Sequence, residues 1–294
     1  MYKHIMNGNK EKSIEYSTYI RQFWVGLMDG DGSLQVNHWR KKSLQYRLVI
    51  KLKNDREKYN LFLLQRIQKS IGGSVRIVYS NLFVVWVENH QSKISQIVKI
   101  FDQYPPYTKR LYNQYRFYLE SLKRNSVDWY LENRDKKYTL YQKAPSVIDK
   151  NLYKAQTSCL SIPNLTKHTE SQSFKGWLSG FIEAEGCFTL LSCSEKCISF
   201  SISQKDEKVL LERINTFFGG QSQVRKVIQK KKRTMYPNIS NSCMESDILY
   251  KKNDFYVLEI YRKTVIDRVL SHCTAYPLYG EKQKSINLLK KTFI

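Results

Sequence analysis

The stretch FWVGLMDGDGSLQVN at residues 23–37 returns in related form as GWLSGFIEAEGCFTL at residues 176–190. Each copy has an apolar run, a glycine, two apolar residues, an acid, a small residue, a second acid and a glycine. Three later features repeat in the same order: RIQKSIGG and RINTFFGG, the VRIV and VRKV that follow, and the Tyr-Pro segments IFDQYPPYTKR and HCTAYPLYGEK. Matched features in one order indicate an internal duplication, so we expect two similar halves.

The spacing of the repeats divides the chain into three parts. The first half covers residues 1–124, a linker covers 125–172, and the second half covers 173–294. The linker is expected to begin with a helix at residues 127–141. Each half has the pattern of helix, strand pair, helix, strand pair, helix, which predicts an α+β fold.

Local patterns place the helix ends and the strands. The first helix of each half is expected to end at Gly32 or Gly186, in the left-handed conformation that glycine favours after a helix. Residues 44–53 then alternate between apolar and polar side chains, which is typical of a strand buried on one face. The polar face of this strand carries Gln45, Arg47, Lys51 and Lys53. Solvated faces normally mix both charge signs, whereas this one is positive and suits the phosphates and base edges of a groove.

The composition narrows the class of protein. Lys and Arg number 49 against 26 Asp and Glu, which gives a formal net charge of +23 and indicates a polyanionic partner. A basic ribosomal or membrane-surface protein is the alternative. The 21 Tyr and 13 Phe argue against a disordered basic chain. No stretch approaches the roughly 20 apolar residues of a membrane span, and no apolar signal segment precedes the first repeat. The six cysteines lack zinc-ligand spacing, which argues against zinc.

Small residues recur four positions apart in the repeated motif. Gly26 and Gly30 share one helix face, as do Gly180 and Ala184. Such spacing allows two helices to approach closely, backbone to backbone. We therefore expect these four residues to form the interface between the two motif helices.

Two acids would then meet at the helix ends. Asp31 and Glu185 would lie beside each other and beside the negative end of each helix dipole. This placement costs on the order of 1 kcal/mol or more, yet it occurs twice at matching positions. Divalent cations, which take oxygen ligands, would offset the cost. The alternative is that the acids cap neighbouring groups, a structural role that suits Asp29 and Glu183 better.

The motifs WVGLMDGDG (24–32) and LSGFIEAEG (178–186) resemble those of monomeric homing endonucleases of the LAGLIDADG family, especially mobile-intron endonucleases of fungal and algal mitochondria. The Gly-Gly and Tyr-Pro features extend the resemblance over nearly the whole chain. It implies two pseudo-symmetric αββαββα halves, with antiparallel sheets forming a DNA-binding saddle and the motif helices packed at the interface.

The resemblance also implies a chemistry. Asp31 and Glu185 would bind Mg²⁺, with the carbonyls of Gly30 and Ala184 as additional ligands. Mn²⁺ is expected to substitute for Mg²⁺, and Ca²⁺ to bind without supporting cleavage. The enzyme would hydrolyse both DNA strands across the minor groove and leave 3′ overhangs.

Further residues match the family pattern less closely. A basic residue follows the Tyr-Pro proline by five positions, as Lys282 in the second half and Arg110, with Lys109 beside it, in the first. Arginine stays protonated, so the role of Arg110 is expected to be electrostatic. Gln204, at the end of a strand, is expected to position water. Lys53 is its looser counterpart and equally suits a phosphate contact.

The outward strand residues are expected to contact DNA, because Gln and Asn pair with adenine and Arg pairs with guanine. In the first half these residues are Ser33, Gln35, Asn37, Trp39, Gln45, Arg47, Lys51 and Arg76. In the second half they are Cys187, Thr189, Leu191, Ser199, Ser201, Ser203 and Arg225. Apolar positions among them would read shape or thymine methyl groups.

The implied partner is double-stranded DNA with a long, mostly asymmetric target site, because the two halves have diverged. Two alternatives are a maturase of the same fold that binds host intron RNA, and a DNA-binding protein without catalysis. The presence of both motif acids favours the endonuclease. Two fused halves already supply a two-fold axis, so we expect a monomer. The family implies a mitochondrion or another organelle, not secretion.

Overall fold

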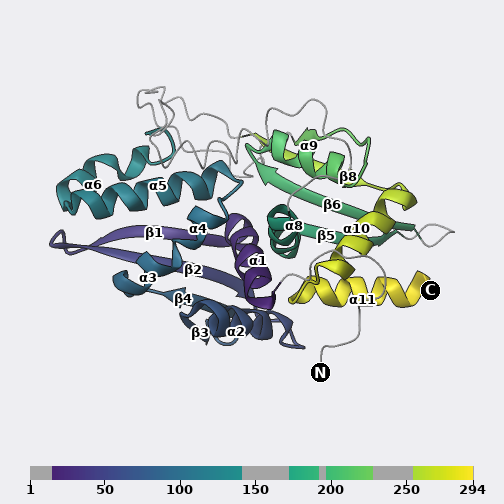
Figure 1. The fold of residues 1–294 in the computed structure, drawn as a ribbon, viewed down its shortest axis with the longest axis horizontal. Helices are drawn as coiled ribbons and strands as arrows, with labels where there is room; N and C mark the ends of the chain where they lie inside the picture. The colour runs from purple at the N-terminus through teal and green to yellow at the C-terminus, as the bar shows by residue number, and fades with distance from the viewer. Residues whose placement is uncertain (1–14, 141–171, 192–196, 228–253, 294) are drawn as a thin grey trace, which may run out of the picture.

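The computed structural model describes residues 15–140, 172–191, 197–227 and 254–293. The two motif helices, α1 and α8, lie side by side at the centre, with the first half on one side and the second half on the other (Figure 1). Each half contains the expected succession of a motif helix, a strand pair, a helix, a second strand pair and closing helices. The predicted α+β fold of two related halves is confirmed.

The elements of the first half run from the motif helix to a short helical turn. They are α1 (Tyr16–Gly30), β1 (Gly32–Trp39), β2 (Ser43–Lys53), α2 (Tyr59–Ile71), β3 (Ser74–Val78), β4 (Phe83–Glu88), α3 (Gln91–Ile97), α4 (Ile100–Gln103), α5 (Lys109–Arg124), α6 (Val127–Asn133) and η1 (Arg134–Lys136). The elements of the second half are α8 (Gln172–Glu185), β5 (Gly186–Leu191), β6 (Cys197–Lys205), α9 (Lys208–Phe217), β7 (Arg225–Val227), β8 (Phe255–Ile260), α10 (Lys263–Ala275) and α11 (Glu281–Phe293).

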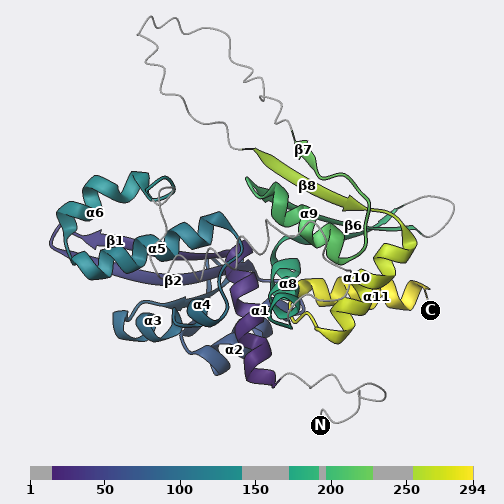
Figure 2. The same ribbon diagram turned by 45° about the horizontal axis from the view of Figure 1, so that its top comes forward.

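The two sheets have the same topology. The strand order is β1-β2-β4-β3 in the first and β5-β6-β8-β7 in the second, and all neighbouring strands are antiparallel. The sheets flank the α1/α8 pair (Figure 2). Leu48 and Ile50 of β2 are fully buried, whereas Gln45 and Lys51 of the same strand are exposed, so the predicted alternation is confirmed. The polar faces of the two sheets are called the saddle face below.

Gly32 and Gly186 begin strands and do not adopt the left-handed conformation, so this prediction was wrong. At the end of α1 the backbone passes through Asp31 with φ −94° and ψ −8°. Glycine is required here by close approach instead. A Cβ on Gly32 would lie 2.3 Å from the Met28 sulfur, and one on Gly186 would lie 2.6 Å from the Ile182 carbonyl oxygen. The first strand of each half therefore starts directly against the last turn of its motif helix.

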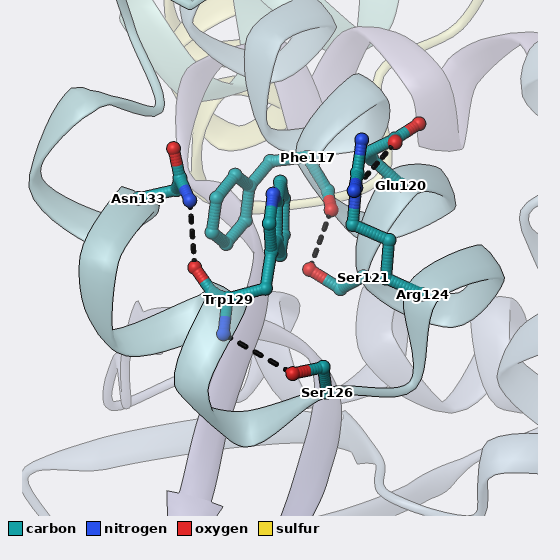
Figure 3. Close-up of polar contacts among 7 residues, drawn as sticks. All are labelled: Phe117, Glu120, Ser121, Arg124, Ser126, Trp129 and Asn133. Atoms are coloured by element: carbon teal, nitrogen blue, oxygen red, sulfur yellow. Dashed lines mark hydrogen bonds and ion pairs between the residues drawn. The ribbon is translucent and has the colours of Figure 1, made fainter.

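The start of the predicted linker folds back onto the first half. The Ser126 side chain accepts a hydrogen bond from the Trp129 backbone N–H at 3.2 Å, which caps α6. The Trp129 ring stacks on Phe117 of α5 with ring centroids 5.3 Å apart (Figure 3). Helix α6 thus packs against the first half.

This helix is shorter than the predicted one at residues 127–141. It ends at Asn133, and a 3₁₀ turn follows. The Asn133 side chain donates to the Trp129 carbonyl at 2.8 Å, and an asparagine that competes for backbone groups in this way disfavours continuation of the helix. The rest of the predicted linker, residues 141–171, lies outside the described residues.

The apolar core extends through both halves. Phe23 and Trp24 of α1 and Trp177 and Phe181 of α8 are almost completely buried. Trp177 stacks on Phe181 with ring centroids 4.8 Å apart. Among the described residues, no helix is both long and apolar enough to cross a bilayer.

Candidate active site and nucleic-acid interface

The motif helices touch through their glycines. A Cβ added to Gly26 would lie 1.9 Å from the carbonyl oxygen of Trp177, and one added to Gly180 would lie 1.8 Å from that of Phe23. A Cβ on Gly30 would lie 2.2 Å from the Ala184 Cβ. Only a hydrogen side chain fits at these positions, so the small residues place α1 and α8 backbone to backbone.

This contact brings the second acids of the two motifs together. The Glu185 carboxylate lies over Gly30, since a Cβ there would be 3.4 Å from Glu185 Oε1. Burial raises the pKa of Glu185 to about 7, and the nearby Asp31 carboxylate adds to the increase. Burial also raises the pKa of Asp31 to about 6, while Lys282 and Arg110 lower it. The Asp31 side chain reaches solvent at the end of α1, and Glu185 is half-buried.

The first acid of the first motif is turned into the protein. Asp29 is fully buried and accepts hydrogen bonds from the backbone N–H groups of Tyr107 (2.9 Å) and Thr108 (3.1 Å). The Thr108 hydroxyl donates to it at 2.5 Å, and Trp177 of the other half donates through its indole N–H at 2.7 Å. Burial raises the pKa of Asp29, and these hydrogen bonds oppose the increase. Asp29 therefore anchors the start of α5.

Glu183 has the same role in the second half. It is buried and accepts hydrogen bonds from the backbone N–H groups of Tyr279 (3.1 Å), Gly280 (2.9 Å) and Lys282 (3.0 Å). These residues span the start of α11 (Glu281–Phe293), the counterpart of α5. Burial raises the pKa of Glu183, and the backbone donors oppose the increase. The structural role expected for the first acids is thus visible at both positions.

The basic residues at the two helix starts are not equivalent. Arg110 donates to the carbonyl oxygens of Gly32 (2.7 Å), Asp29 (2.7 Å), Met28 (2.9 Å) and Gly30 (3.1 Å). Its guanidinium therefore caps the C-terminal end of α1. The Gly30 carbonyl, a predicted metal ligand, makes the longest of these four contacts.

Lys282 lies close enough to both acids for its charge to lower their pKa values. Its charge lowers the pKa of Asp31 more than that of Arg110 does. Within the described ranges, its ammonium group makes no hydrogen bond or ion pair with another side chain. Gln204 lies on the same side of the site, and its side-chain amide donates to Glu185 Oε1 at 3.4 Å. The second half thus supplies a cation and an amide beside the paired acids.

Lys53 is not the counterpart of Gln204, and that prediction was wrong. In the sheet register, Leu52 of β2 aligns with Gln204 of β6, and Lys53 aligns with Lys205. Leu52 is 8% exposed and points into the core, whereas Lys53 points to the opposite, solvent-exposed face of the strand. The first half therefore lacks an amide at this position, and a phosphate contact stays the prediction for Lys53.

The oxygen donors at the helix ends fit a divalent cation. Hard cations such as Mg²⁺ take carboxylate, carbonyl, phosphate and water oxygens, and Mg²⁺ needs only one or two carboxylates when a phosphate completes the site. Asp31 and Glu185 would provide the carboxylates, and burial, which raises the pKa of both, disfavours their ionised forms unless a cation neutralises them. No group of three or more His, Cys, Asp or Glu side chains suited to a metal occurs in the described part of the chain. The predicted carbonyls of Gly30 and Ala184, together with substrate and water, would supply the remaining ligands.

Comparisons with known proteins agree with this geometry. The family model described as LAGLIDADG endonuclease matches residues 24–120 and 178–254. A protein of Dictyostelium citrinum named probable intron-encoded endonuclease aI3 is 41% identical over 278 residues, which cover 93% of this chain and 95% of the relative. The chain belongs to the LAGLIDADG endonuclease family. A protein of the same name from Debaryomyces hansenii is 38% identical over 290 residues, but they cover only 38% of that longer protein.

Solved structures of this family share the fold. The LAGLIDADG homing endonuclease I-LtrWI, crystallised bound to its target DNA, superposes with a TM-score of 0.60. The match covers 94% of this chain and 90% of I-LtrWI at 19% sequence identity. At this identity the likeness concerns the architecture of two halves and two sheets.

In this LAGLIDADG protein, the predicted DNA contacts of the first half share one face of the sheet. Gln35 pairs with Arg47 and Asn37 with Gln45, so their side chains lie on the same side. Continuing across the sheet, Lys51 and Arg76 both pair with Val85. The same pairing places Ser33 and Trp39 on this face, and Trp39 is 54% exposed. The predicted residues therefore form one continuous surface.

The predicted contacts of the second half also share a face. Cys187 pairs with Ser201, and Thr189 pairs with Ser199. Ser203 and Arg225 both pair with Val257 of β8. Leu191 ends β5, and its side chain lies outside the described part of the structure.

One acid on the saddle face was missed from the sequence. Glu259 of β8 pairs with Ser201 and forms an ion pair with Arg225. The hydroxyl of Tyr261 donates to the same carboxylate at 3.2 Å. The alternation of β8, FYVLEI, could have revealed this position, because Glu259 follows Phe255 and Val257 on one face.

An aromatic pair on the first sheet was missed as well. The Lys51 ammonium lies 4.2 Å from the ring centroid of Tyr79 and 4.0 Å from that of Phe83. Tyr79, in the β3–β4 turn, is 66% exposed. The two rings hold Lys51 in one direction on the saddle face, which no local sequence signal indicates.

Proposed function

We propose that this protein is a site-specific double-stranded DNA endonuclease that uses divalent metal ions to hydrolyse both strands. The observation that carries the proposal is the meeting of Asp31 and Glu185 at the ends of two helices that lie between the two sheets. The formal net charge of +23 favours a nucleic acid as the substrate. The names of the relatives, probable intron-encoded endonucleases, support the same activity.

The side chains divide the work as follows. The saddle face would bind the two half-sites of the DNA target, one on each sheet, and this would place the phosphates to be cut over the ends of α1 and α8. Asp31 and Glu185 would hold Mg²⁺, which supplies Lewis acidity and a bound water of lowered pKa. Lys282 would stabilise negative charge on the attacked phosphate, and Gln204 would keep the Glu185 carboxylate oriented. Arg110 would hold the end of α1 rigid, since its donors are occupied by carbonyls.

The finer features of the proposal rest on the family. Cutting would occur across the minor groove and leave 3′ overhangs, Mn²⁺ would replace Mg²⁺, and Ca²⁺ would support binding alone. The chain would act as a monomer on a long, mostly asymmetric site. A mitochondrion or another organelle is the proposed compartment, because relatives are named for introns, including one of the Cox1 intron series in Schizosaccharomyces pombe.

The test is cleavage of a randomised duplex DNA library by the full chain, with Mg²⁺ or with Ca²⁺. The wild type is compared with Asp31→Asn and Glu185→Gln, which preserve shape and remove charge. A staggered cut at one sequence that requires Mg²⁺ and disappears in both variants is the expected result. Specific binding without cutting by the wild type would refute the enzyme and leave a DNA-recognition protein. Binding to intron RNA alone would point to a maturase.

A further inference from the structure

The repeated RIQKSIGG and RINTFFGG segments extend further back than their quoted letters. Residues 60–66 read NLFLLQR in α2, and residues 207–213 read EKVLLER at the start of α9. The shared Leu-Leu and the final Arg align Asn60 with Glu207 and Arg66 with Arg213. These residues have no place in the proposed chemistry so far, and in the structure all four contact the opposite half.

The first contact is a helix cap across the interface. Glu207 Oε1 accepts a hydrogen bond from the backbone N–H of Lys109 at 2.5 Å. Asn60 Oδ1 accepts one from the backbone N–H of Glu281 at 3.1 Å. Lys109 and Glu281 occupy equivalent positions after the Tyr-Pro segment, at the first residues of α5 and α11. Each half thus caps the last long helix of the other.

The second contact lies six residues further along each helix. The Arg213 guanidinium lies 5.2 Å from the ring centroid of Tyr107, and the Arg66 guanidinium lies 4.9 Å from that of Tyr279. Tyr107 and Tyr279 are again equivalent, and each stands two residues before the capped amide. The segment from Tyr107 to Lys109 is therefore contacted at both ends by the second half, and the segment from Tyr279 to Glu281 is contacted at both ends by the first half.

We infer that a crossed clamp joins the two halves, formed by Asn60, Arg66, Glu207 and Arg213. Through it, each half positions the basic residue in the first turn of the other half's last long helix, which is Arg110 in α5 and Lys282 in α11. Arg110 and Lys282 directly follow the capped residues Lys109 and Glu281. Fixing the first turn of α5 therefore directs Arg110 toward the carbonyls at the end of α1, beside the acids. Fixing the first turn of α11 directs Lys282 toward the paired acids themselves. The inference rests on the proposed nuclease function and adds four positioning residues to it.

The capping side chains Glu207 and Asn60 differ in charge, and each suits the residue that it caps. The helix that begins with Lys109 is capped by the carboxylate of Glu207, whereas the helix that begins with Glu281 is capped by the neutral amide of Asn60. The Lys109 charge and backbone N–H both lower the pKa of Glu207, which burial raises to about 7. An acid in place of Asn60 would face Glu281, so the neutral amide avoids repulsion between like charges.

The clamp also binds a backbone amide that the first acid of the motif, Asp29, does not bind. Asp29 binds the amides of Tyr107 and Thr108 but leaves that of Lys109 to Glu207. Consecutive amides at the start of α5 are thus divided between an acid of the same half and an acid of the other. Free N–H groups at a helix start need acceptors, and removal of a cap acceptor loosens the first turn.

The first arm of the test is hydrogen exchange of the full chain without DNA. Glu207→Ala is expected to speed exchange at the start of α5 about tenfold, the scale of a lost cap, without a comparable change at the start of α11. Asn60→Ala is expected to do the reverse. Glu207→Gln keeps an acceptor, as the amide of Asn60 does, and should exchange like the wild type. Unchanged exchange in the opposite half would overturn the clamp, whether or not the chain cuts DNA.

The second arm measures the two strands separately. The substrate is a supercoiled plasmid carrying the duplex that the wild type selects from the randomised library, end-labelled on either strand after cutting. Glu207→Ala and Asn60→Ala should each accumulate nicked plasmid, with about a tenfold bias toward opposite strands, and Glu207→Gln should restore balance. Equal losses on both strands, in proportion to lost thermal stability, would reduce these residues to structural ones and refute the positioning role. Failure of the wild type to cut would instead refute the nuclease, and the exchange arm would still decide on the clamp.

Discussion

The close approach of the motif helices gives a strong prediction for Gly180→Ala. The added Cβ would lie 1.8 Å from the carbonyl oxygen of Phe23 and 2.9 Å from the backbone nitrogen of Leu27. Both neighbours are backbone atoms of α1, so no side-chain rotation relieves the contact. Relief to an ordinary separation of about 3.5 Å requires the helices to move apart by roughly 1.7 Å.

This movement has two costs of different kinds. Overpacking of a close interface typically destabilises a protein by about 1–3 kcal/mol, which lowers Tm by roughly 2–10 °C in a chain of this size. The same movement separates the ends of α1 and α8, where Asp31 and Glu185 meet. A displacement of about 1 Å at a catalytic centre costs on the order of 100-fold in rate. We therefore expect cleavage to fall more steeply than stability.

The assay compares Tm and the single-turnover cleavage rate for Gly180→Ala and a matched control, Gly176→Ala. The control lies one turn earlier on α8, and its Cβ would meet the side chain of Gln22, 2.3 Å from Oε1. Rotation of that side chain relieves the contact with Oε1 and leaves a milder one with the Gln22 Cβ at 2.8 Å, so the control should lose less of both properties than Gly180→Ala. Cleavage by Gly180→Ala within threefold of the wild type, or an equal loss in the control, would refute the reasoning.

Three further predictions concern the charges of the site. Burial raises the pKa of Glu185 from 4.5 to about 7. In the absence of metal, the folded state therefore loses stability relative to the unfolded state as the pH rises from 4.5 to 7, and the ionised carboxylate opposes folding above pH 7. Glu185→Gln should therefore raise the metal-free free energy of unfolding at pH 8 by on the order of 1 kcal/mol, with no gain at pH 4, and an unchanged free energy at pH 8 would contradict this. Arg110→Ala leaves four carbonyls without their donor and should cost about 1–3 kcal/mol in unfolding experiments, whereas Lys282→Ala should cost less than about 0.5 kcal/mol but slow cleavage at least tenfold. A larger loss of stability in Lys282→Ala and a larger loss of cleavage in Arg110→Ala would contradict these roles. A carboxylate on the saddle face can accept from cytosine N4, so Glu259→Gln should change preference at one base pair by about 1–3 kcal/mol in binding to singly substituted sites, and a uniform loss at all positions would show a phosphate-related effect instead.

The sequence predicted the parts of the molecule that repeat with a regular period. The apolar–polar alternation of residues 44–53 identified the buried and exposed faces of β2, because side chains of a strand alternate regardless of its partners. The four-residue spacing of Gly26 and Gly30 indicated a close helix contact, because both lie on one helix face. These features depend only on local geometry, so one chain is enough to recognise them.

Features that depend on alignment across loops were not predictable in the same way. The pairing of Lys53 with Gln204 failed by one residue, which reverses the direction of a strand side chain. The four carbonyl contacts of Arg110 and the cross-half cap of Lys109 by Glu207 join residues about 80 to 100 positions apart. No periodicity within either segment encodes such contacts, because they arise from how the packed halves meet.

The two-residue spacing between the acids of each motif follows from helix geometry. Successive helix residues are rotated by about 100°, so side chains two positions apart point about 200° away from each other. In the first half, Asp29 points inward to the amides of Tyr107 and Thr108, while Asp31 emerges at the helix end and is exposed to solvent. In the second half, Glu183 and Glu185 divide in the same way. A spacing of three or four would place both acids on one face, and either the helix cap or the proposed metal site would be lost. The Asp-Gly-Asp and Glu-Ala-Glu patterns therefore combine one acid that anchors the start of a later helix with one that lies at the candidate site, and the small residue between them lets the helices meet.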